Sequence, residues 1–367
     1  MNTKERDSEK YPIIIRAGKR ALEHIKKNGL NDDDIDTFAG ASGGPKGLML
    51  AGLDQKIFTE WFTKREKALN MIGSSIGSFR LAAIAQKNPA EKIRIFYDRY
   101  INQQYSDTPD AAEVSNEARA ILNYYIDKDS IEHILSHPFM RLHIIAARSR
   151  GLGKSDCKIT LAPFFAAAYT MNMFDRKNLR FFFERYIFRD CRSAILENQF
   201  NDIITKTVNL NKQNFYDALM ASGAIPFAMK RVTDIEDVHG VFRDGGLIDY
   251  HFDLPFNDIS EKLVLYPHFF DKLCPGWLDK KIKNRKPSPN NYSNVVMIAP
   301  NESFIESLPG SKIPDRNDFM LYKNCPEKRI EIWEQVVKRS FELADAFMHL
   351  TRTGEIANAA TPIEEIL

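Results

Sequence analysis

One stretch decides the fold of this chain: Asn70-Met71-Ile72-Gly73-Ser74-Ser75-Ile76-Gly77-Ser78-Phe79-Arg80. The apolar residues before Gly73 predict a strand, and residues 76–85 predict a helix. The turn between them matches G-x-S-x-G, in which a serine sits on a sharp strand-to-helix reversal. Glycine on both sides leaves room for the neighbouring strand and helix. The N–H groups that open the helix favour negative charge near Ser75.

A second strand–loop–helix unit precedes this one. Residues 35–39 predict a short strand, residues 40–47 a glycine-rich loop, and residues 48–53 a helical apolar run. Consecutive glycines let several backbone N–H groups converge on one anion. The loop is not a Walker A loop, because no Gly-Lys-Ser/Thr closes it. We therefore expect an anion-binding loop here, with a tight turn that binds nothing as the alternative.

The glycine-rich loop creates a choice between two serines. Gly40-Ala41-Ser42-Gly43-Gly44 also fits G-x-S-x-G, so the pattern alone does not select the nucleophile. An elbow serine needs a helix directly behind it, and residues 76–85 supply one behind Ser75. Ser42 is followed by Gly43, Gly44 and Pro45, which predict a wider loop. Local chemistry therefore favours Ser75.

The remaining chain alternates between helical and strand patterns. Helices are expected over residues 18–27, 89–103, 110–127, 129–136, 213–221 (with Asn211 as N-cap) and 327–350 (closed by Gly354). Strands are expected over residues 142–147, 203–208, 241–246, 262–266 and 295–299. The aromatic-rich region 161–188 is expected to pack in the core rather than to line an acyl pocket. This alternation predicts an α/β fold with a mainly parallel central sheet and helices on both faces.

Composition and charge exclude several classes of protein. The 367 residues carry 51 Lys and Arg against 49 Asp and Glu, so the whole chain is not built to bind nucleic acid. The four cysteines form no C-x-x-C and indicate a reducing compartment. The charged N-terminus, residues 1–7, predicts no signal peptide, and no apolar stretch reaches the roughly 18 residues of a transmembrane helix. We expect a cytoplasmic protein without metal or cofactor, since no His, Cys or Asp cluster has ligand spacing.

Four blocks in fixed order resemble the patatin-like phospholipase family. They are the loop at residues 42–47, the elbow at 73–77, Ala221-Ser222-Gly223-Ala224-Ile225-Pro226-Phe227, and Asp244-Gly245-Gly246. The resemblance covers residues 35–256. The family loop usually reads Asp-Gly-Gly-Gly-x-Arg-Gly, whereas this chain has Ala41 to Gly47 with an acid and one glycine replaced and Lys46 in place of Arg.

The resemblance implies a patatin-like core and a Ser–Asp dyad without histidine. Residues 1–34 would then be an N-terminal extension, and residues 257–367 would add strands, a basic loop and an amphipathic helix. Ser75 would attack a carboxylic ester of a glycerophospholipid or lysophospholipid, with Asp244 as general base. The oxyanion hole would use Gly43, Gly44, Lys46 and Gly47. Gly73 and Gly77 would allow the tight turn at Ser75, and Gly245 and Gly246 would leave room for Asp244 to approach it.

Three other functions stay open at this stage. A Ser-His-Asp esterase could use His239, His251 or His268, which lie near Asp244 in the chain. A patatin scaffold without turnover could bind lipid, and the altered loop at Ala41 and Ser42 is the only support for that hypothesis. A hydrolase could also depend on a membrane or protein activator.

A basic segment suggests a peripheral membrane surface. Four apolar residues precede five cations in the order Phe269, Phe270, Leu273, Trp277 and Lys280, Lys281, Lys283, Arg285, Lys286. Apolar anchors beside cations suit an anionic lipid surface. A solvated loop after a packed segment is the alternative interpretation.

Overall fold

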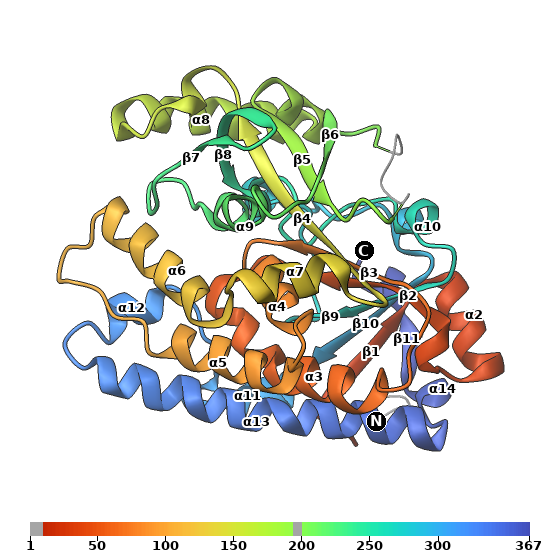
Figure 1. Ribbon diagram of the computed structural model, residues 1–367. Coiled ribbons are helices and arrows are strands. Elements are labelled where there is room, and N and C mark those ends of the chain that lie inside the picture. Colours follow the sequence, from red (N-terminus) through yellow and green to blue (C-terminus); the bar gives the residue numbers. More distant parts are fainter. Residues whose placement is uncertain (1–9, 194–199) are drawn as a thin grey trace.

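A computed structural model describes residues 10–193 and 200–367 of the chain (Figure 1). The charged residues 1–7, on which the absence of a signal peptide was predicted, lie outside the described part. The described residues form one sheet of eleven strands. The strands are β1 (Ile13–Ala17), β2 (Ile35–Gly40), β3 (Leu69–Ser74), β4 (Met140–Ser149), β5 (Phe183–Arg189), β6 (Thr205–Asn209), β7 (Val232–Ile235), β8 (Val238–Asp244), β9 (Leu263–Pro267), β10 (Val295–Pro300) and β11 (Ala360–Pro362).

The centre of the sheet is parallel, as the alternation of patterns predicts. The strand order is β11-β1-β10-β9-β2-β3-β4-β5-β6, and β10, β9, β2, β3 and β4 all run in the same direction. Antiparallel pairs appear outside this centre, where β1 joins β10 and where β4 joins both β5 and β8. The sheet is therefore mixed but mainly parallel, and it takes strands from all three ranges into which the sequence was divided.

The helices agree with most of the sequence patterns. They are α2 (Lys19–Asn28), α3 (Ala51–Lys56), α4 (Ile76–Ile84), α5 (Pro89–Ile101), α6 (Ala111–Tyr125), α7 (Lys128–Ser136), α8 (Lys158–Phe174), α9 (Phe215–Gly223), α10 (Phe256–Ile259), α11 (Glu302–Glu306), α12 (Asn317–Leu321), α13 (Pro326–Thr353) and α14 (Ile356–Ala359). The long C-terminal helix α13 ends at Gly354, whose left-handed φ of 75° suits glycine.

Two helix starts differ from the sequence prediction. Helical turns follow the glycine-rich loop from Gly44 rather than Leu48, as a 3₁₀ segment over Gly44–Leu50. Pro45 suits such a start, because its fixed φ matches a first turn that needs no N–H. Asn211 does not cap α9 directly. Its side chain accepts from the N–H groups of Gln213 and Asn214 in the turn before the helix.

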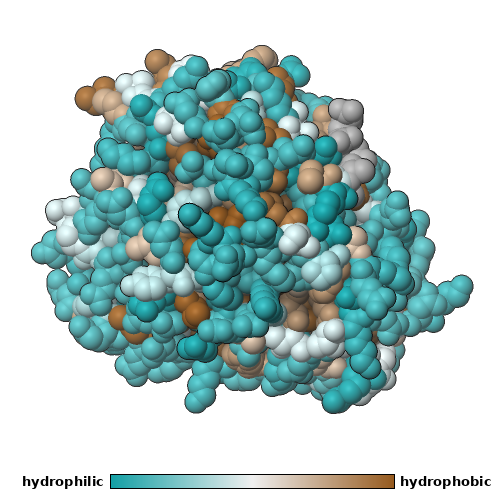
Figure 2. Space-filling view, in the orientation of Figure 1, coloured by the Kyte–Doolittle hydropathy of each residue, from teal (hydrophilic) through white to brown (hydrophobic). Residues whose placement is uncertain are grey.

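The aromatic-rich region 161–188 lies mainly in α8 and β5. The inner face of α8 packs in a small core of its own that includes Leu161, Phe164, Phe165 and Ala168. Helix α8 lies along the upper edge of the molecule in Figure 1, and Figure 2 shows hydrophobic residues at that edge above a largely hydrophilic face. No helix within residues 10–193 and 200–367 combines the length and the apolarity needed to cross a bilayer.

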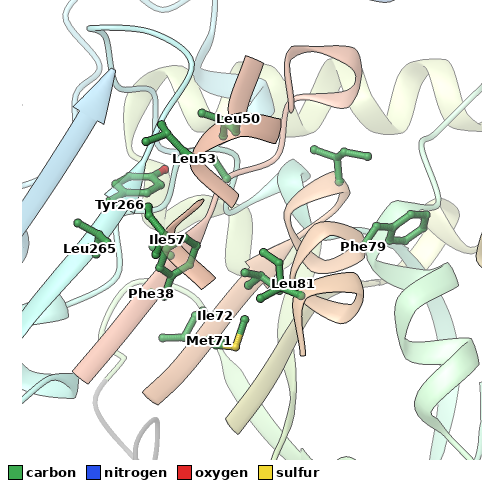
Figure 3. Packing of buried hydrophobic residues seen from close by; sticks show 14 of the residues in the cluster. Phe38, Leu50, Leu53, Ile57, Met71, Ile72, Phe79, Leu81, Leu265 and Tyr266 are labelled. Carbon is green, nitrogen blue, oxygen red and sulfur yellow. The ribbon is translucent and has the colours of Figure 1, made fainter. Parts of the chain in front are cut away.

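The main core lies between the parallel strands and the helices that follow β2 and β3 (Figure 3). Phe38 on β2 packs edge-on against Phe58, and both rings are buried. Leu53 on α3 and Leu81 on α4 point toward the same strands in Figure 3, and both are fully buried. This packing fixes α4, and with it the elbow at its start, over the C-terminal ends of β2 and β3.

A buried ion pair ties the glycine-rich loop to the elbow helix. Arg80 on α4 donates through two nitrogens to Asp54 on α3, and both side chains are at most 1% exposed. The hydroxyl of Tyr97 on α5 donates to Asp54 at 2.6 Å and also lies 3.1 Å from the carbonyl oxygen of Gly47. The Asp54 carboxylate on α3 therefore joins α4 and α5, and the Tyr97 hydroxyl extends this link to the glycine-rich loop.

We predict that Arg80→Met costs about 3–5 kcal/mol in the free energy of unfolding, because the Asp54 charge stays buried without its partner. The double variant Arg80→Met/Asp54→Leu should recover most of that loss. Urea denaturation followed by circular dichroism measures both values. The control is Lys67→Met, which breaks the exposed Lys67–Asp33 pair and should cost much less. Equal losses in the Arg80 variant and the control would contradict this account of the buried pair.

Candidate active site

Ser75 occupies the sharp turn that the G-x-S-x-G pattern predicts. β3 ends at Ser74, α4 begins at Ile76, and Ser75 between them has φ 54° and ψ −126°. A positive φ is uncommon for a residue with a side chain and marks a constrained backbone. Space around the turn is minimal, since a Cβ on Gly77 would lie 1.9 Å from the carbonyl oxygen of Gly40. A Cβ on Gly73 would meet the Ser78 backbone at 2.7 Å.

The Ser75 hydroxyl donates to Asp244 Oδ2 at 2.7 Å. Asp244 is the last residue of β8, which pairs with β4, and β4 pairs in turn with the strand that leads into Ser75. The two side chains are separated by 169 positions in the chain, so only the sheet brings them together. Both are buried, at 4% and 6% exposure.

The surroundings of Asp244 suit a general base. Burial raises the pKa of this carboxyl, although Arg316, the Ser75 hydroxyl, the Gly246 N–H and Lys280 act in the opposite direction. Asp244 Oδ1 accepts the Gly246 N–H at 2.7 Å, which orients the carboxylate and leaves Oδ2 for Ser75. A raised pKa brings a carboxylate closer to the basicity that proton removal from a hydroxyl requires.

The two glycines after Asp244 make its approach to Ser75 possible. A Cβ on Gly245 would lie 2.3 Å from the carbonyl oxygen of Ile145, and a Cβ on Gly246 would lie 2.6 Å from Ser42 Oγ. Because they have no side chains, Gly245 packs directly against β4 and Gly246 packs directly against the glycine-rich loop. Further along it, the buried Asp249 accepts from Arg185 Nε at 2.7 Å, which anchors the turn. The sequence analysis did not identify that ion pair.

Ser222 holds the backbone of Ser75, a role that the sequence analysis did not assign. Its hydroxyl accepts the Ser75 N–H at 2.9 Å and donates to the Ile145 carbonyl oxygen at 2.7 Å. Ser78 Oγ is also within 2.9 Å. The Ala221–Phe227 block was singled out in the sequence, but the partner of its serine depends on the packing of α9 against β4 and α4.

Ser42 lies beside the site without a base of its own. Its hydroxyl donates to Ser74 Oγ at 3.0 Å, and its N–H donates to the Tyr250 carbonyl oxygen at 2.9 Å. The hydroxyl that is hydrogen-bonded to a carboxylate is that of Ser75. The geometry thus agrees with the preference for Ser75 that the helix start indicates.

The glycine-rich loop borders the same space, with Gly43 lining a polar cavity and Gly44 an apolar cavity beside Ser75. Within the described residues, neither the Gly43 nor the Gly44 N–H donates to a protein acceptor. The Lys46 N–H instead turns back to the Gly43 carbonyl oxygen at 3.4 Å. Gly47 lies inside the 3₁₀ segment, where a Cβ would meet Arg80 and Ile76 at 3.3 Å. Of the four predicted oxyanion residues, Gly43 and Gly44 are therefore the ones with N–H groups available for a ligand.

The three histidines considered for a triad form no hydrogen bond with Ser75 or Asp244 in the described part of the chain. His239 is exposed and lies near Asp234. His251 and His268 are buried and stack edge-on against each other, and burial lowers the pKa of His268 to about 4 and that of His251 well below its usual range.

A polar cavity of about 220 Å³ opens in front of the two catalytic candidates. Three cations line it, and none of them forms an ion pair within the described residues: Lys46, Lys280 and Arg316. The Lys280 ammonium lies 3.6 Å from the centre of the Tyr250 ring. Desolvation and its two cationic neighbours lower the pKa of Lys280. Lys46 and Arg316, together with the protonated fraction of Lys280, place positive charge on one side of Ser75, where Asp315 also lines the cavity.

An apolar cavity of about 270 Å³ adjoins the other side of Ser75. Ser75, Ile225 and Arg316 line both cavities, so Ser75 lies where the two meet. The apolar walls come from α4, α5, α6 and α12 and from the segment after α9, and include Phe79, Tyr100, Val114, Ala118, Ile121, Met229, Phe319 and Met320. None of them comes from the aromatic region 161–188, but only part of that region packs in a core, since Phe174 and Phe181 are 81% and 56% exposed.

The structure does not support the expected lipid anchors near residue 270. Phe269 is fully buried and Leu273 is 7% exposed, so neither can insert into a bilayer in the folded protein. Two of the five cations have partners or surroundings inside the protein. Lys280 lines the polar cavity, and Arg285 donates to the carbonyl oxygen of Asn172 at 2.8 Å. The burial of Phe269 and Leu273 agrees with the alternative of a packed segment followed by a solvated loop, and membrane binding by the basic loop stays a prediction.

Comparison with known proteins does not assign the site. No protein-family model matches this chain, and no curated protein matches its sequence. What the site can do therefore follows from its geometry: a serine paired with a buried carboxylate, free N–H groups beside it, and polar and apolar cavities on its two sides.

We predict that a fluorophosphonate probe labels the protein at Ser75. The hydroxyl should react because Asp244 can take its proton, and mass spectrometry of the labelled peptide identifies the modified residue. Ser75→Ala should abolish labelling. Ser42→Ala is the matched control and should still be labelled, since Ser42 has no carboxylate partner. An adduct on Ser42, with Ser75 unmodified, would reverse the assignment of the two loops.

Proposed function

We propose that this protein is a serine acyl hydrolase that cleaves carboxylic esters of glycerophospholipids or lysophospholipids. The observation that carries the proposal is the 2.7 Å hydrogen bond from the elbow serine Ser75 to Asp244. A hydroxyl on a constrained turn, bonded to a buried carboxylate and facing a cavity, is the arrangement that nucleophilic acyl transfer requires. The resemblance of the four sequence blocks to patatin-like phospholipases supports the same chemistry.

The first half of the reaction forms an acyl-enzyme. Ser75 Oγ attacks the ester carbonyl carbon while its proton moves to Asp244 Oδ2. Negative charge develops on the carbonyl oxygen and is stabilised by the N–H groups of Gly43 and Gly44, aided by the N-terminal end of α4. When the tetrahedral intermediate collapses, the leaving alkoxide takes the proton from Asp244. The acyl group stays on Ser75.

The second half returns the enzyme to its starting state. Asp244 removes a proton from a water molecule, which attacks the acyl carbon. The same N–H groups stabilise the second oxyanion. Collapse of this intermediate releases the fatty acid, and Ser75 Oγ recovers its proton from Asp244. One carboxylate thus serves as base and acid in turn, and no histidine takes part.

The two cavities support a lipid substrate with an anionic head group. An acyl chain suits the apolar cavity, because its walls offer mainly hydrocarbon surface. The phosphate of a glycerophospholipid suits the polar cavity, where Lys46, Lys280 and Arg316 have no ion-pair partner in the described residues. Ser75 lies where the two cavities meet, which corresponds to the position of the ester between chain and head group.

The proposal is tested by acyl release from a panel of phospholipids and lysophospholipids. We predict that Asp244→Asn lowers kcat/KM by a factor on the order of 10³ or more, as for members of one catalytic unit. His239→Ala, His251→Ala and His268→Ala should each keep most of the activity. The histidine variants are essential, because a buried histidine with a pKa of about 4 would titrate like a carboxyl. A collapse of the rate in a folded histidine variant would favour the triad.

The other two alternatives correspond to distinct results of the same assay. Probe labelling of Ser75 without turnover on any lipid would favour a scaffold that binds lipid. Turnover that requires added vesicles or a second protein would favour an activator-dependent hydrolase. Release of fatty acid by the purified chain alone, lost in Ser75→Ala, is the result that the proposal requires.

We predict a specific effect of Arg316 on the pH profile. Asp244 acts as a base only when ionised, so kcat/KM should fall as the pH drops through its raised pKa. Arg316 is the strongest of the influences that lower this pKa. Arg316→Met should therefore move the acid limb to higher pH and weaken hydrolysis of anionic lipids more than that of neutral esters. Lys281→Met, an exposed neighbour of the cavity lysine Lys280, is the control and should leave both properties unchanged. An acid limb that does not move in Arg316→Met would contradict this electrostatic role.

A further inference from the structure

Helix α8 exposes an apolar face along its whole length. Ile159 is 86% exposed, Phe174 is 81% exposed, and Met173 is 54% exposed. Between these ends lie exposed small residues at helical spacing: Ala162, Pro163, Ala166, Ala167 and Thr170. Leu152 before the helix and Phe181 after it extend the same exposed set. We call the exposed uncharged side chains named in this paragraph, from Leu152 to Phe181, the α8 face.

The α8 face has a cationic border. Lys154, Lys158, Lys177 and Arg180 are all exposed, and no ion pair involves them in the described part of the chain. The segment from residue 151 to residue 181 contains two acids. Asp156 contacts Arg231 and Arg243, and Asp175 accepts the backbone N–H of Lys177. The border therefore carries a surplus of positive charge around an apolar strip.

The inner side of α8 connects this face to the candidate active site. Phe165 contacts Phe227 and Trp277, with ring centres 5.4 Å and 6.4 Å apart. Trp277 lines the polar cavity in front of Ser75. Figure 1 shows α8 at the outer edge of the molecule, with β8 and α9 lying between it and the lower helices. A flat partner on the α8 face would thus lie close to the wall of the cavity.

We propose that the α8 face docks on a lipid bilayer that contains anionic lipid. The inner face of α8 is packed in the protein, and its outer face offers exposed apolar area beside lysine and arginine, the two contributions on which binding to an anionic membrane surface depends. The cations would meet the lipid phosphates, and each one near the surface strengthens binding by about fivefold.

The charge pattern disfavours a second copy of this chain as the occupant. In a symmetric dimer the same patch faces itself, so the four cations of one copy would approach the four of the other. Like charges across an interface oppose association. An anionic bilayer instead complements the border while it covers the apolar strip.

Docking through α8 does not depend on catalysis, whereas delivery of the substrate from that bilayer rests on the proposed ester hydrolysis. Phe165 and Trp277 lie between the α8 face and the polar cavity, so lipid bound at that face would lie near the cavity that Ser75 lines. Under this proposal, lipids that reside in a membrane are preferred substrates, and a soluble short-chain ester serves only as a surrogate that needs no docking.

The test is sedimentation with vesicles of phosphatidylcholine, alone or mixed with an equal part of phosphatidylglycerol. The full chain should bind the mixed vesicles more tightly, and salt should weaken that binding. Ile159→Ser/Met173→Ser/Phe174→Ser should weaken it by at least about tenfold, because three exposed side chains lose their burial in lipid. Lys154→Gln/Lys158→Gln/Lys177→Gln/Arg180→Gln should remove the preference for phosphatidylglycerol.

The matched control removes exposed apolar side chains elsewhere. Tyr124→Ser/Leu321→Ser changes residues that are 55% and 65% exposed on other helices, and it should bind vesicles like the unmodified chain. Circular dichroism and hydrolysis of a short-chain soluble ester check that the α8 variants stay folded. The residues changed in the α8 variants do not line either cavity, and hydrolysis of the soluble ester should therefore be retained.

Three results would overturn the docking proposal. They are no vesicle binding by the unmodified chain, unchanged binding in the triple α8 variant, or a dimer that this variant dissociates while vesicles stay unbound. Ser75→Ala separates the two proposals, because it should bind vesicles normally and hydrolyse nothing. Vesicle binding through α8 without hydrolysis by the unmodified chain would support the docking surface and contradict the proposed function.

Discussion

The structure depends on the contact between Gly77 and the end of β2. A Cβ at Gly77 would lie 1.9 Å from the Gly40 carbonyl oxygen, so the first turn of α4 rests directly on the neighbouring strand. This contact forces the reversal at Ser75, whose positive φ costs about 1–3 kcal/mol unless the surroundings hold it. They do so through the Ser222 hydroxyl on one side and the buried Arg80–Asp54 pair on the other. The glycine-rich loop, the elbow and α3 therefore form one rigid unit.

Burial produces the electrostatics of the site as well as its shape. The same apolar surroundings that exclude water from Asp244 raise its pKa, and the charge of Arg316 lowers the pKa by a smaller amount. Burial also keeps His251 and His268 uncharged, which removes them as competing bases at neutral pH. The positive charge of the polar cavity then remains available to an anionic ligand. The raised pKa of Asp244 and the positive charge of the polar cavity thus both result from how the chain packs around Ser75.

Several features of the site followed from local sequence. The strand before Ser75, the helix after it and the glycines at 73 and 77 were predicted, because hydrophobic periodicity and backbone freedom are properties of neighbouring residues. The mainly parallel sheet followed from the alternation of strands and helices. The pairing of Ser75 with Asp244 was implied only by a family resemblance. Nothing local in the chain indicates that residues 169 positions apart share a hydrogen bond.

Sequence by itself determined the elements and the residue types at the elbow, whereas tertiary structure decided which residues surround them. Phe269 and Phe174 have the same side chain, yet one is fully buried and the other is 81% exposed. Lys280 and Arg316 likewise come from distant segments and meet at one cavity. The physical reason is that burial and charge proximity are set by contacts between segments, and a linear pattern records only the preferences of each segment.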